Sequence, residues 1–388
     1  MGLKVAFLIL SNLSTGMGTE NVVMQYCKYK PDDADVTIYQ TDIPHGKLSE
    51  DKYDFGNSHP TIVTIRSGLY RLGFVNKFPF GAAFFIFLIV PVYFYILRVS
   101  PRFRKMRGEL KNYDVVYICQ PYLSVIVPKG PAVVAAEHNF EPKKQGLGRI
   151  ITWLVGSDLM WRRIDYYHLY SKGSWFLDRF GKRGFIIENG SRFKFSSERP
   201  GKVSNVIRFG YATRLVKCKG ILRLVEAFSI LKMAYIAKKV ELHIYGEGPL
   251  KDRIQEEEGI FLHGWVKDEE MPRILSSVDC FVYPTTCDNF SLAVVEALGA
   301  GSYVIASDVL RGVFDRFEKI GVLEYCSPDP LALAKSMERF ANLDMTEEAF
   351  EKSKELILQD YSWESISKKL FTEFYKIAGK GEKHQASG

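Results

Sequence analysis

Short apolar runs rich in Val, Ile and Tyr alternate with helix-length segments along the whole chain. In the first half these runs are 4–10, 36–39, 61–65, 114–119, 132–136, 166–170 and 185–187. In the second half they are 205–209, 240–245, 259–262, 278–283, 303–306 and 321–323. Continuous apolar strands that alternate with helices predict parallel sheets with both faces covered. We therefore predict an α/β fold with two doubly wound, Rossmann-like domains.

The length of 388 residues is sufficient for two such domains with full cores. The segment 196–204 (SSERPGKVS) is polar and contains Pro and Gly, so we interpret it as the linker. The expected domains are then 1–197 and 203–360. The tail 379–388 (GKGEKHQASG) has the composition of a disordered segment.

The net charge of +7 suits an acidic partner but does not choose among a nucleoside diphosphate, an anionic membrane surface and a nucleic acid. The six cysteines are scattered, with no C-x-x-C pair, so the sequence predicts neither a zinc site nor a disulfide framework. Several lie inside apolar runs and are interpreted as buried thiols, and a reducing compartment is the simpler interpretation. The first apolar run is too short for a signal peptide and reads as a first buried strand.

The stretch 283–301 (YPTTCDNFSLAVVEALGAG) reads as the end of a strand, a polar loop and a helix. Ser291 is a good N-cap, and the free N–H groups at a helix start bind anions. Asp288 lies in the loop and Glu296 in the second turn of the helix. Since a carboxylate would repel a phosphate, we expect both to contact sugar hydroxyls. An ordinary strand-to-helix crossover is the alternative.

This stretch resembles the signature of the retaining glycosyltransferases of the GT-B fold, family four. The residues that fit the signature are Asn289, Phe290, Ser291, Leu292, Glu296 and Ala297. Two positions depart from it, because Asp288 stands where the family usually has Glu and Asn289 stands where Gly is common. The resemblance implies two Rossmann-like domains facing across a cleft, with a C-terminal helix, 361–377, that crosses back to the first, acceptor-side domain.

The resemblance also implies a donor, a UDP- or GDP-sugar, bound by the second domain without a metal ion. Glu296 would bind the ribose, Asp288 the donor sugar, and N–H groups near Leu292 the diphosphate. The sequence agrees on the metal, because no Asp-x-Asp pair follows a strand of either domain. Arg214 and Lys219 have the spacing of the family's diphosphate-binding pair. Two fixed cations would stabilise a departing diphosphate more than the bound donor. Taken alone, this pair would be a solvated basic loop.

Three further sites complete the resemblance. Gly246 and Gly248 form a Gly-x-Gly-Pro turn on the nucleotide side. Gly16 and Gly18 follow the first strand and would let the backbone approach the donor phosphate and the acceptor. His138 follows the strand 132–136, at a strand end where such sheets bind ligands, and would lie near C6 of the donor sugar. The alternative for Gly16 and Gly18 is a plain turn, and the alternative for His138 is a loop histidine bonded to nearby backbone.

The segment 78–97 has no charged residue and is long enough to span a bilayer. Pro91 breaks the helix, and strands on both sides are expected in one sheet, so a single span is disfavoured. A buried helix pair is one interpretation. We favour a surface, 78–107, that dips into one leaflet, because the run from Arg98 to Arg107 adds attraction to anionic headgroups.

The sequence thus predicts a retaining hexosyltransferase that is peripheral on the cytoplasmic face of the membrane. Its acceptor would be a lipid-linked molecule or another glycan, and no nucleic acid is expected as a partner. Three alternatives stay open. They are a sugar epimerase of the same fold, a nucleic-acid glucosyltransferase, and a non-catalytic nucleotide-sugar-binding membrane scaffold.

Overall fold

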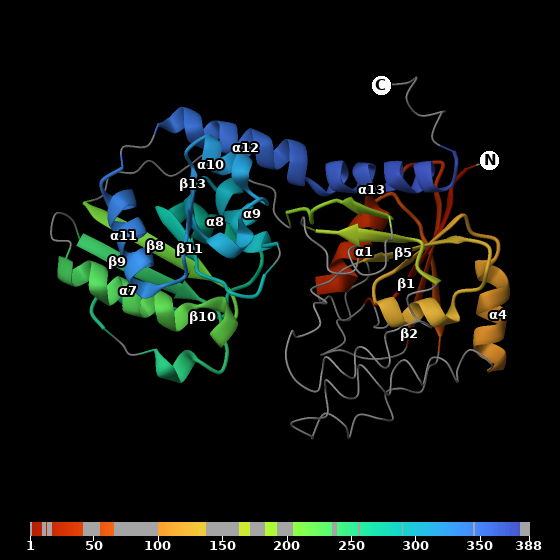
Figure 1. The fold of residues 1–388 in the computed structure, drawn as a ribbon, viewed down its shortest axis with the longest axis horizontal. Coiled ribbons are helices and arrows are strands. Elements are labelled where there is room, and N and C mark those ends of the chain that lie inside the picture. Colours follow the sequence, from red (N-terminus) through yellow and green to blue (C-terminus); the bar gives the residue numbers. More distant parts are fainter. Residues whose placement is uncertain are drawn as a thin grey trace. The chain divides into compact units, whose positions relative to one another are not determined.

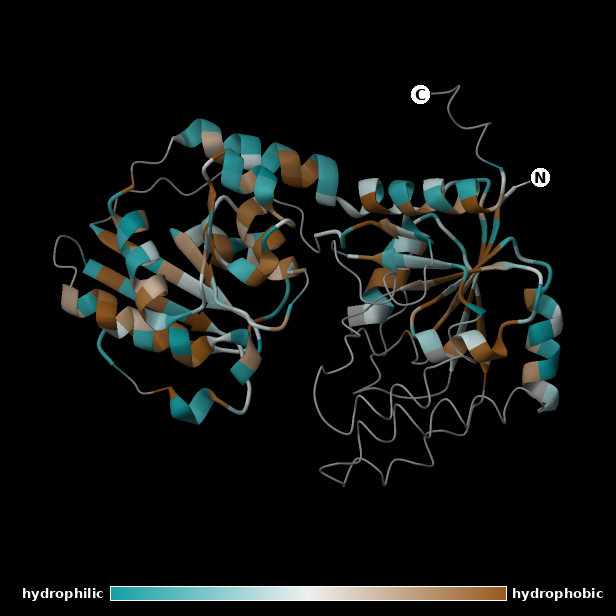
Figure 2. Ribbon diagram, in the orientation of Figure 1, coloured by the Kyte–Doolittle hydropathy of each residue, from teal (hydrophilic) through white to brown (hydrophobic). Residues whose placement is uncertain are grey.

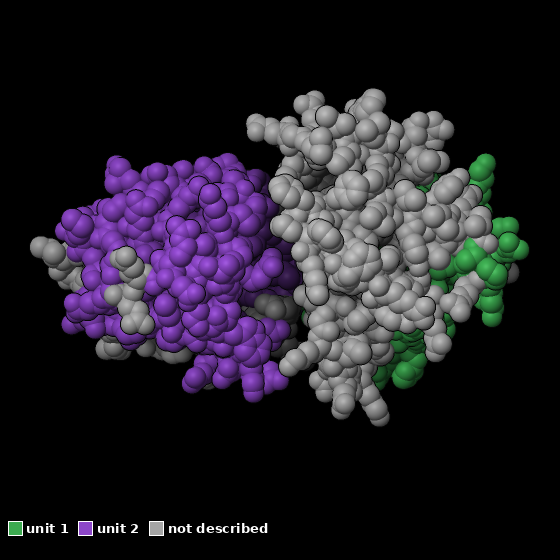
Figure 3. Space-filling view, turned by 90° about the horizontal axis from the view of Figure 1, so that it is seen from below, with its two compact units in different colours: residues 1–188, 363–388 green, residues 189–362 purple. Residues whose placement is uncertain are grey.

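The computed structural model describes most of the chain. The described residues are 2–9, 13, 18–41, 55–65, 100–136, 163–170, 183–191, 205–234, 239–254, 257–288, 290–343 and 346–380. The chain forms two compact units, which Figure 3 colours separately. The first unit is Met1–Glu188 with Trp363–Gly388, and the second is Asn189–Ser362. The division therefore falls before the predicted linker, 196–204, which lies outside the described residues.

The first unit contains a seven-stranded parallel sheet in the order β3-β2-β1-β4-β5-β6-β7 (Figure 1). Its strands are β1 Lys4–Leu8, β2 Asp35–Thr41, β3 Thr61–Ile65, β4 Val115–Ile118, β5 Ala132–Ala136, β6 Tyr166–Leu169 and β7 Arg183–Ile186. Its helices are α1 Gly18–Lys28, α4 Pro101–Leu110, the 3-10 helix η4 Pro121–Ile126 and α13 Trp363–Ile377.

Both faces of this sheet are buried, because successive residues of a strand point to opposite faces. In β1, Val5 and Phe7 belong to the core cluster that includes residues of α1 and α13. Their neighbours Ala6 and Leu8 belong to the other cluster, which includes residues of α4. Covering on both faces explains the apolar runs VAFL of β1 and VVYI of β4. Figure 2 colours much of the centre of this sheet brown.

Helix α13 belongs to the first unit although it ends the chain. The Ser367 hydroxyl donates to the backbone carbonyl oxygens of Tyr26 and Tyr29, each at 3.0 Å. This is the return of the C-terminal helix that the resemblance implies. The prediction of a disordered tail from residue 379 is wrong at the start of the tail, because the Lys380 ammonium donates to the Asp114 carboxylate at 2.7 Å. Residues 381–388 lie outside the described residues.

The second unit contains a six-stranded parallel sheet in the order β10-β9-β8-β11-β12-β13. Its strands are β8 Val206–Ala212, β9 Lys239–Tyr245, β10 Ile260–Gly264, β11 Cys280–Tyr283, β12 Tyr303–Ser307 and β13 Leu323–Cys326. Its helices are α7 Ile221–Ala234, α8 Met271–Ser277, α9 Leu292–Gly299, α10 Asp315–Lys319, α11 Pro330–Ala341 and α12 Glu347–Tyr361. Short 3-10 helices are η6 Lys217–Lys219, η7 Lys251–Arg253 and η8 Asp308–Leu310.

The strand order of the second sheet reverses direction at β8. This strand pairs with β9 on one side and with β11 on the other. In open parallel sheets the loops leave in opposite directions at such a point, and ligands bind beyond the carboxyl ends of the two strands. The fold therefore directs attention to the loops that follow β8 and β11.

The alternation of runs predicted this architecture correctly, since each predicted strand overlaps an observed one. The segment 78–97 lies outside the described residues. Among the helices that the structure describes, none has the length and apolar character needed to cross a bilayer.

Candidate functional site

The loops after β8 and β11 meet beyond the carboxyl ends of these strands. The backbone N–H of Thr286 donates to the carbonyl oxygen of Cys218 at 2.8 Å, which ties one loop to the other. Gly220 has φ of 78°, and a Cβ atom there would lie 2.0 Å from the carbonyl oxygen of Pro284. Only glycine permits this approach, because every other residue has a Cβ atom. The approach brings Lys219, which precedes Gly220, close to the loop that begins at Pro284.

Lys219 and Asp288 form an ion pair at this junction. The ammonium nitrogen of Lys219 lies 2.7 Å from each carboxylate oxygen of Asp288. The two side chains are 15% and 7% exposed, so the pair is largely removed from water. A charge-assisted contact of this length is stronger than a hydrogen bond between neutral groups. Two residues that sequence analysis assigned to one site are therefore in direct contact.

Two hydroxyl groups complete the environment of the Asp288 carboxylate. The hydroxyls of Tyr283 and Thr285 donate to the same carboxylate oxygen, Oδ2, at 2.6 Å and 2.7 Å. Burial, together with the Asp288 charge, raises the pKa of Tyr283 well above its usual range, which keeps its hydroxyl protonated as a donor. The carboxylate is thus held by three side chains from two loops and a strand end.

The loop that carries Arg214 and Lys219 is shaped by Tyr211. This buried side chain lies at the end of β8, and its hydroxyl is 3.4 Å from the carbonyl oxygens of both residues. Arg214 itself is exposed. One hydroxyl therefore contacts the backbone of both cationic residues.

Helix α9 begins directly after the second loop. Ser291 is its N-cap, and the serine Oγ accepts a hydrogen bond from the backbone N–H of Val294 at 3.3 Å. Leu292 is the first helical residue, and Glu296 follows in the second turn with 2% exposure. Phe290 stacks on Tyr361 with ring centroids 6.2 Å apart. The strand and the capped helix are those predicted, and a helix start of this kind, three residues after the Asp288 that Lys219 contacts, can bind an anion.

The glycines of the Gly-x-Gly-Pro turn allow close packing of two loops. A Cβ atom at Gly246 would lie 2.1 Å from the carbonyl oxygen of Thr213, and one at Gly248 would lie 2.6 Å from that of Leu215. The backbone N–H of Leu215 in turn donates to the carbonyl oxygen of Glu247 at 2.9 Å. This turn therefore buttresses the loop of Arg214 and Lys219.

The other predicted site residues lie outside the described residues or in the first unit. Gly16, His138 and Asn289 lie outside the described residues. Gly18 begins helix α1 in the first unit, earlier than the predicted helix start near residue 21. No group of three His, Cys, Asp or Glu side chains is arranged to hold a metal ion in the part of the chain that the structure describes.

Sequence analysis missed the three side chains that organise the site. Tyr211, Tyr283 and Thr285 are a strand interior residue, a strand end and a loop threonine, and all three are buried. Tyr283 is the last residue of β11, at the edge where ligands bind, and this position was the only available signal.

Comparisons with known proteins show a likeness to glycosyltransferases. Residues 207–342 match the family model of the glycosyl transferases group 1. An uncharacterised glycosyltransferase of Methanocaldococcus jannaschii is 27% identical over 179 residues, which are 43% of this chain and 44% of that protein. The poly(ribitol-phosphate) alpha-N-acetylglucosaminyltransferase of Staphylococcus aureus is 29% identical over 178 residues, which are 42% of this chain and 34% of that protein. The chain thus matches less than half the length of these curated relatives.

A solved structure extends the likeness to the whole fold. The Anabaena protein HepE, in complex with UDP, aligns over 96% of this chain and 100% of its own, with a TM-score of 0.67 and 16% identity. The chain therefore has the fold of the GT-B glycosyltransferases, and its second unit carries the sequence match to the glycosyl transferases group 1.

Proposed function

We propose that this chain is a retaining glycosyltransferase that moves a sugar from a UDP- or GDP-sugar to an acceptor hydroxyl. The observation that carries the proposal is the position of the buried Lys219–Asp288 pair beside the capped start of α9, at the reversal point of the second sheet. A cation and free helix N–H groups at one spot suit a diphosphate. The UDP in the HepE structure supports the same class of donor.

The ion pair suggests how Lys219 is used. Paired with Asp288, the ammonium is neutralised and held in place rather than freely hydrated. A diphosphate brings more negative charge than one carboxylate, so it would draw one or more of the three ammonium protons towards itself. As the bond to the sugar breaks, the charge on the diphosphate grows and this contact strengthens, which lowers the barrier. Arg214 would supply the second cation, while Asp288 orients Lys219 and reaches the donor sugar.

We propose that the transfer proceeds with retention and without a metal ion. The cations and the N–H groups of α9 would take the place of a divalent ion on the diphosphate. The acceptor hydroxyl would attack from the face that the diphosphate leaves, and the diphosphate would take its proton. No protein nucleophile is then required. We expect transfer to persist in EDTA. We also expect the anomeric proton signal of the product, measured by NMR, to show the same configuration as in the donor. Inversion in the product would overturn the proposed mechanism.

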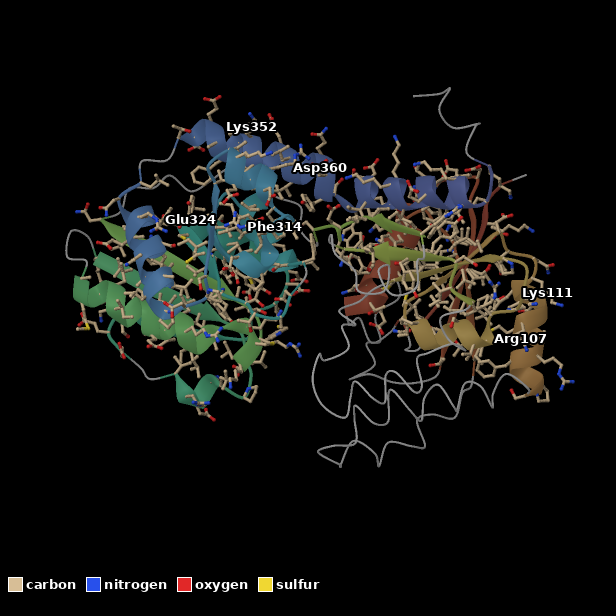
Figure 4. The ribbon with its side chains drawn as sticks, in the orientation of Figure 1. Arg107, Lys111, Phe314, Glu324, Lys352 and Asp360 are labelled. Atoms are coloured by element: carbon tan, nitrogen blue, oxygen red, sulfur yellow. The ribbon has the colours of Figure 1, made fainter. Side chains whose placement is uncertain are left out.

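The acceptor is proposed to be a lipid-linked molecule or another glycan at the cytoplasmic membrane face. The name of the S. aureus relative specifies a poly(ribitol-phosphate) acceptor, which supports this class. Helix α4 adds support, because Arg104 and Lys105 are exposed while Phe103 and Met106 are buried. Arg104 and Lys105, with Arg107 labelled in Figure 4, would belong to the proposed membrane surface 78–107.

The test is a thermal-shift panel of UDP-, GDP- and ADP-sugars with the native chain, Glu296→Ala and the control Glu269→Ala. A ligand present at roughly 100 times its dissociation constant stabilises the protein by about 2.7 kcal/mol. One nucleotide should raise the melting temperature of the native chain and of Glu269→Ala, whose exposed side chain lies outside the site. It should not raise that of Glu296→Ala. No shift of the native chain with any nucleotide would overturn the donor-site proposal.

A further inference from the structure

Two of the six cysteines, 69 residues apart in the sequence, touch at the candidate site. The sulfur atoms of Cys218 and Cys287 lie 2.7 Å apart. Cys218 directly precedes Lys219, and Cys287 directly precedes Asp288. The contact is fixed by the backbone, because the N–H and the hydroxyl of Thr286 both donate to the Cys218 carbonyl oxygen, at 2.8 Å and 3.2 Å.

These two thiols are also the accessible ones. Cys287 is exposed and Cys218 is partly exposed, whereas the other four cysteines are buried. The buried ones are Cys27, Cys119, Cys280 and Cys326. Sequence analysis predicted that several cysteines are buried thiols, and this is confirmed for these four. It did not predict the contact of the accessible pair, because only the fold brings Cys218 and Cys287 together.

The surroundings give the two sulfur atoms different roles. Burial, the contact with Cys218 and the charge of Asp288 raise the pKa of the Cys287 thiol to about 11. Cys287 therefore stays protonated near neutral pH and donates its S–H to the Cys218 sulfur. The Cys218 sulfur accepts that hydrogen bond, so of the two sulfur atoms it is the one assigned to attack a disulfide.

We propose that Cys218 and Cys287 form an oxidisable dithiol, a modification site for low-molecular-weight disulfides beside Lys219 and Asp288. In the first step the Cys218 thiolate attacks a disulfide RSSR, giving Cys218–S–SR and one thiol RSH after protonation. In the second step the Cys287 thiol loses its proton and attacks the Cys218 sulfur, which releases the second RSH. The two protein thiols are oxidised, and RSSR is reduced to two RSH. A disulfide bond is about 2.05 Å long, so the sulfur atoms need to approach by less than roughly 1 Å.

The disulfide would act on the donor site, and this consequence rests on the proposed function. It would lock together the loops that carry Lys219 and Asp288. Lys219 binds both oxygens of Asp288 here, so it must be released, at least in part, to reach a diphosphate. A cross-link one residue away on each loop opposes that release. We therefore expect the oxidised chain to bind nucleoside diphosphate at least about fivefold more weakly, and by linkage bound nucleotide to oppose oxidation.

The experiment incubates the full chain with glutathione disulfide, removes the reagent and measures the intact mass. The expected product has lost two hydrogen atoms and carries no glutathione, and a non-reduced peptide map links Cys218 to Cys287. Its melting temperature should rise by about 5–10 °C, since the bond closes a long loop in the unfolded chain. Cys218→Ser and Cys287→Ser should abolish the linked product, whereas the control Cys326→Ser should retain it. Stable addition of glutathione without closure, or six unchanged thiols, would overturn the proposal.

A second arm separates this inference from the proposed function. UDP and GDP are titrated into the reduced and the oxidised chain, with Cys218→Ser, which lacks the attacking sulfur, treated identically as the control. Weaker binding to the oxidised native chain, with no change in the variant, supports the link to the donor site. Equal affinity of the two forms would overturn that link. If the disulfide forms but neither form binds any nucleotide, the dithiol stands and the donor-site proposal fails.

Discussion

Replacing Lys219 by Met tests whether the ion pair at the site is a buried, stabilising contact. The substitution keeps an unbranched side chain but removes the ammonium that lies 2.7 Å from both oxygens of Asp288. Breaking a buried ion pair costs about 3–5 kcal/mol because the remaining charge is left unpaired. Here Tyr283 and Thr285 still donate to the carboxylate, so we expect about 2–3 kcal/mol. For a unit of this size that loss lowers the melting temperature by roughly 5–10 °C.

Differential scanning calorimetry of the full chain measures this effect. The matched control is Lys217→Met, which removes an exposed cation from the same loop and should change the melting temperature by less than about 2 °C. Asp288→Asn completes a double-mutant cycle, and the two substitutions should show a coupling energy above about 1 kcal/mol. If Lys219→Met melts together with Lys217→Met, or if the coupling is zero, the reasoning from the buried pair is wrong.

Three further predictions concern the surroundings of the site. Gly246→Ala should lower the free energy of unfolding, measured by urea denaturation, by at least about 3 kcal/mol, because the added Cβ would meet a backbone oxygen. The control Gly312→Ala, also at positive φ but in open space, should lower it by about 1 kcal/mol. Equal costs would contradict the close approach. Ser291→Ala should cost about 1 kcal/mol through loss of the N-cap of α9, with Ser291→Thr retaining most of it. Burial lowers the pKa of both His243 and His263, so the unfolded chain binds protons first and stability should fall as the pH drops through about 6.5. Replacing both by Gln should flatten this profile between pH 7 and 5.5, and an unchanged profile would refute it.

The sequence predicted the fold and the frame of the site well, for a physical reason. Strands buried on both faces and a helix with a serine N-cap leave local signals, which located β11, α9 and their loop. The contacts within the site depend on residues distant in sequence, such as Lys219 and Asp288, whose proximity follows from the pairing of β8 with β11. No periodicity or spacing encodes which hydroxyls complete that contact, so Tyr283 was assigned only to a strand.

The glycines of the site show a second limit of prediction from sequence. The pattern identified Gly246 as a site residue, but the structure gives it a steric reason to be glycine, because the loop of Thr213 passes within 2.1 Å of where a Cβ would be. A tight turn next to a ligand and a tight turn next to another loop require the same residue. Sequence alone therefore located the turn without assigning its function.

The return of α13 to the first unit has a consequence for how the chain folds during synthesis. The hydroxyl of Ser367 bonds to Tyr26, 341 residues earlier, and Phe371 and Phe374 are fully buried in the core that β1 begins. That core is incomplete until residues 363–377 have left the ribosome. The second unit, Asn189–Ser362, is continuous and is made before α13. Domains generally fold as units during translation. We therefore expect the second unit to complete its fold before the first, although it lies later in the sequence. Until α13 is made, apolar residues of the first unit's sheet remain exposed.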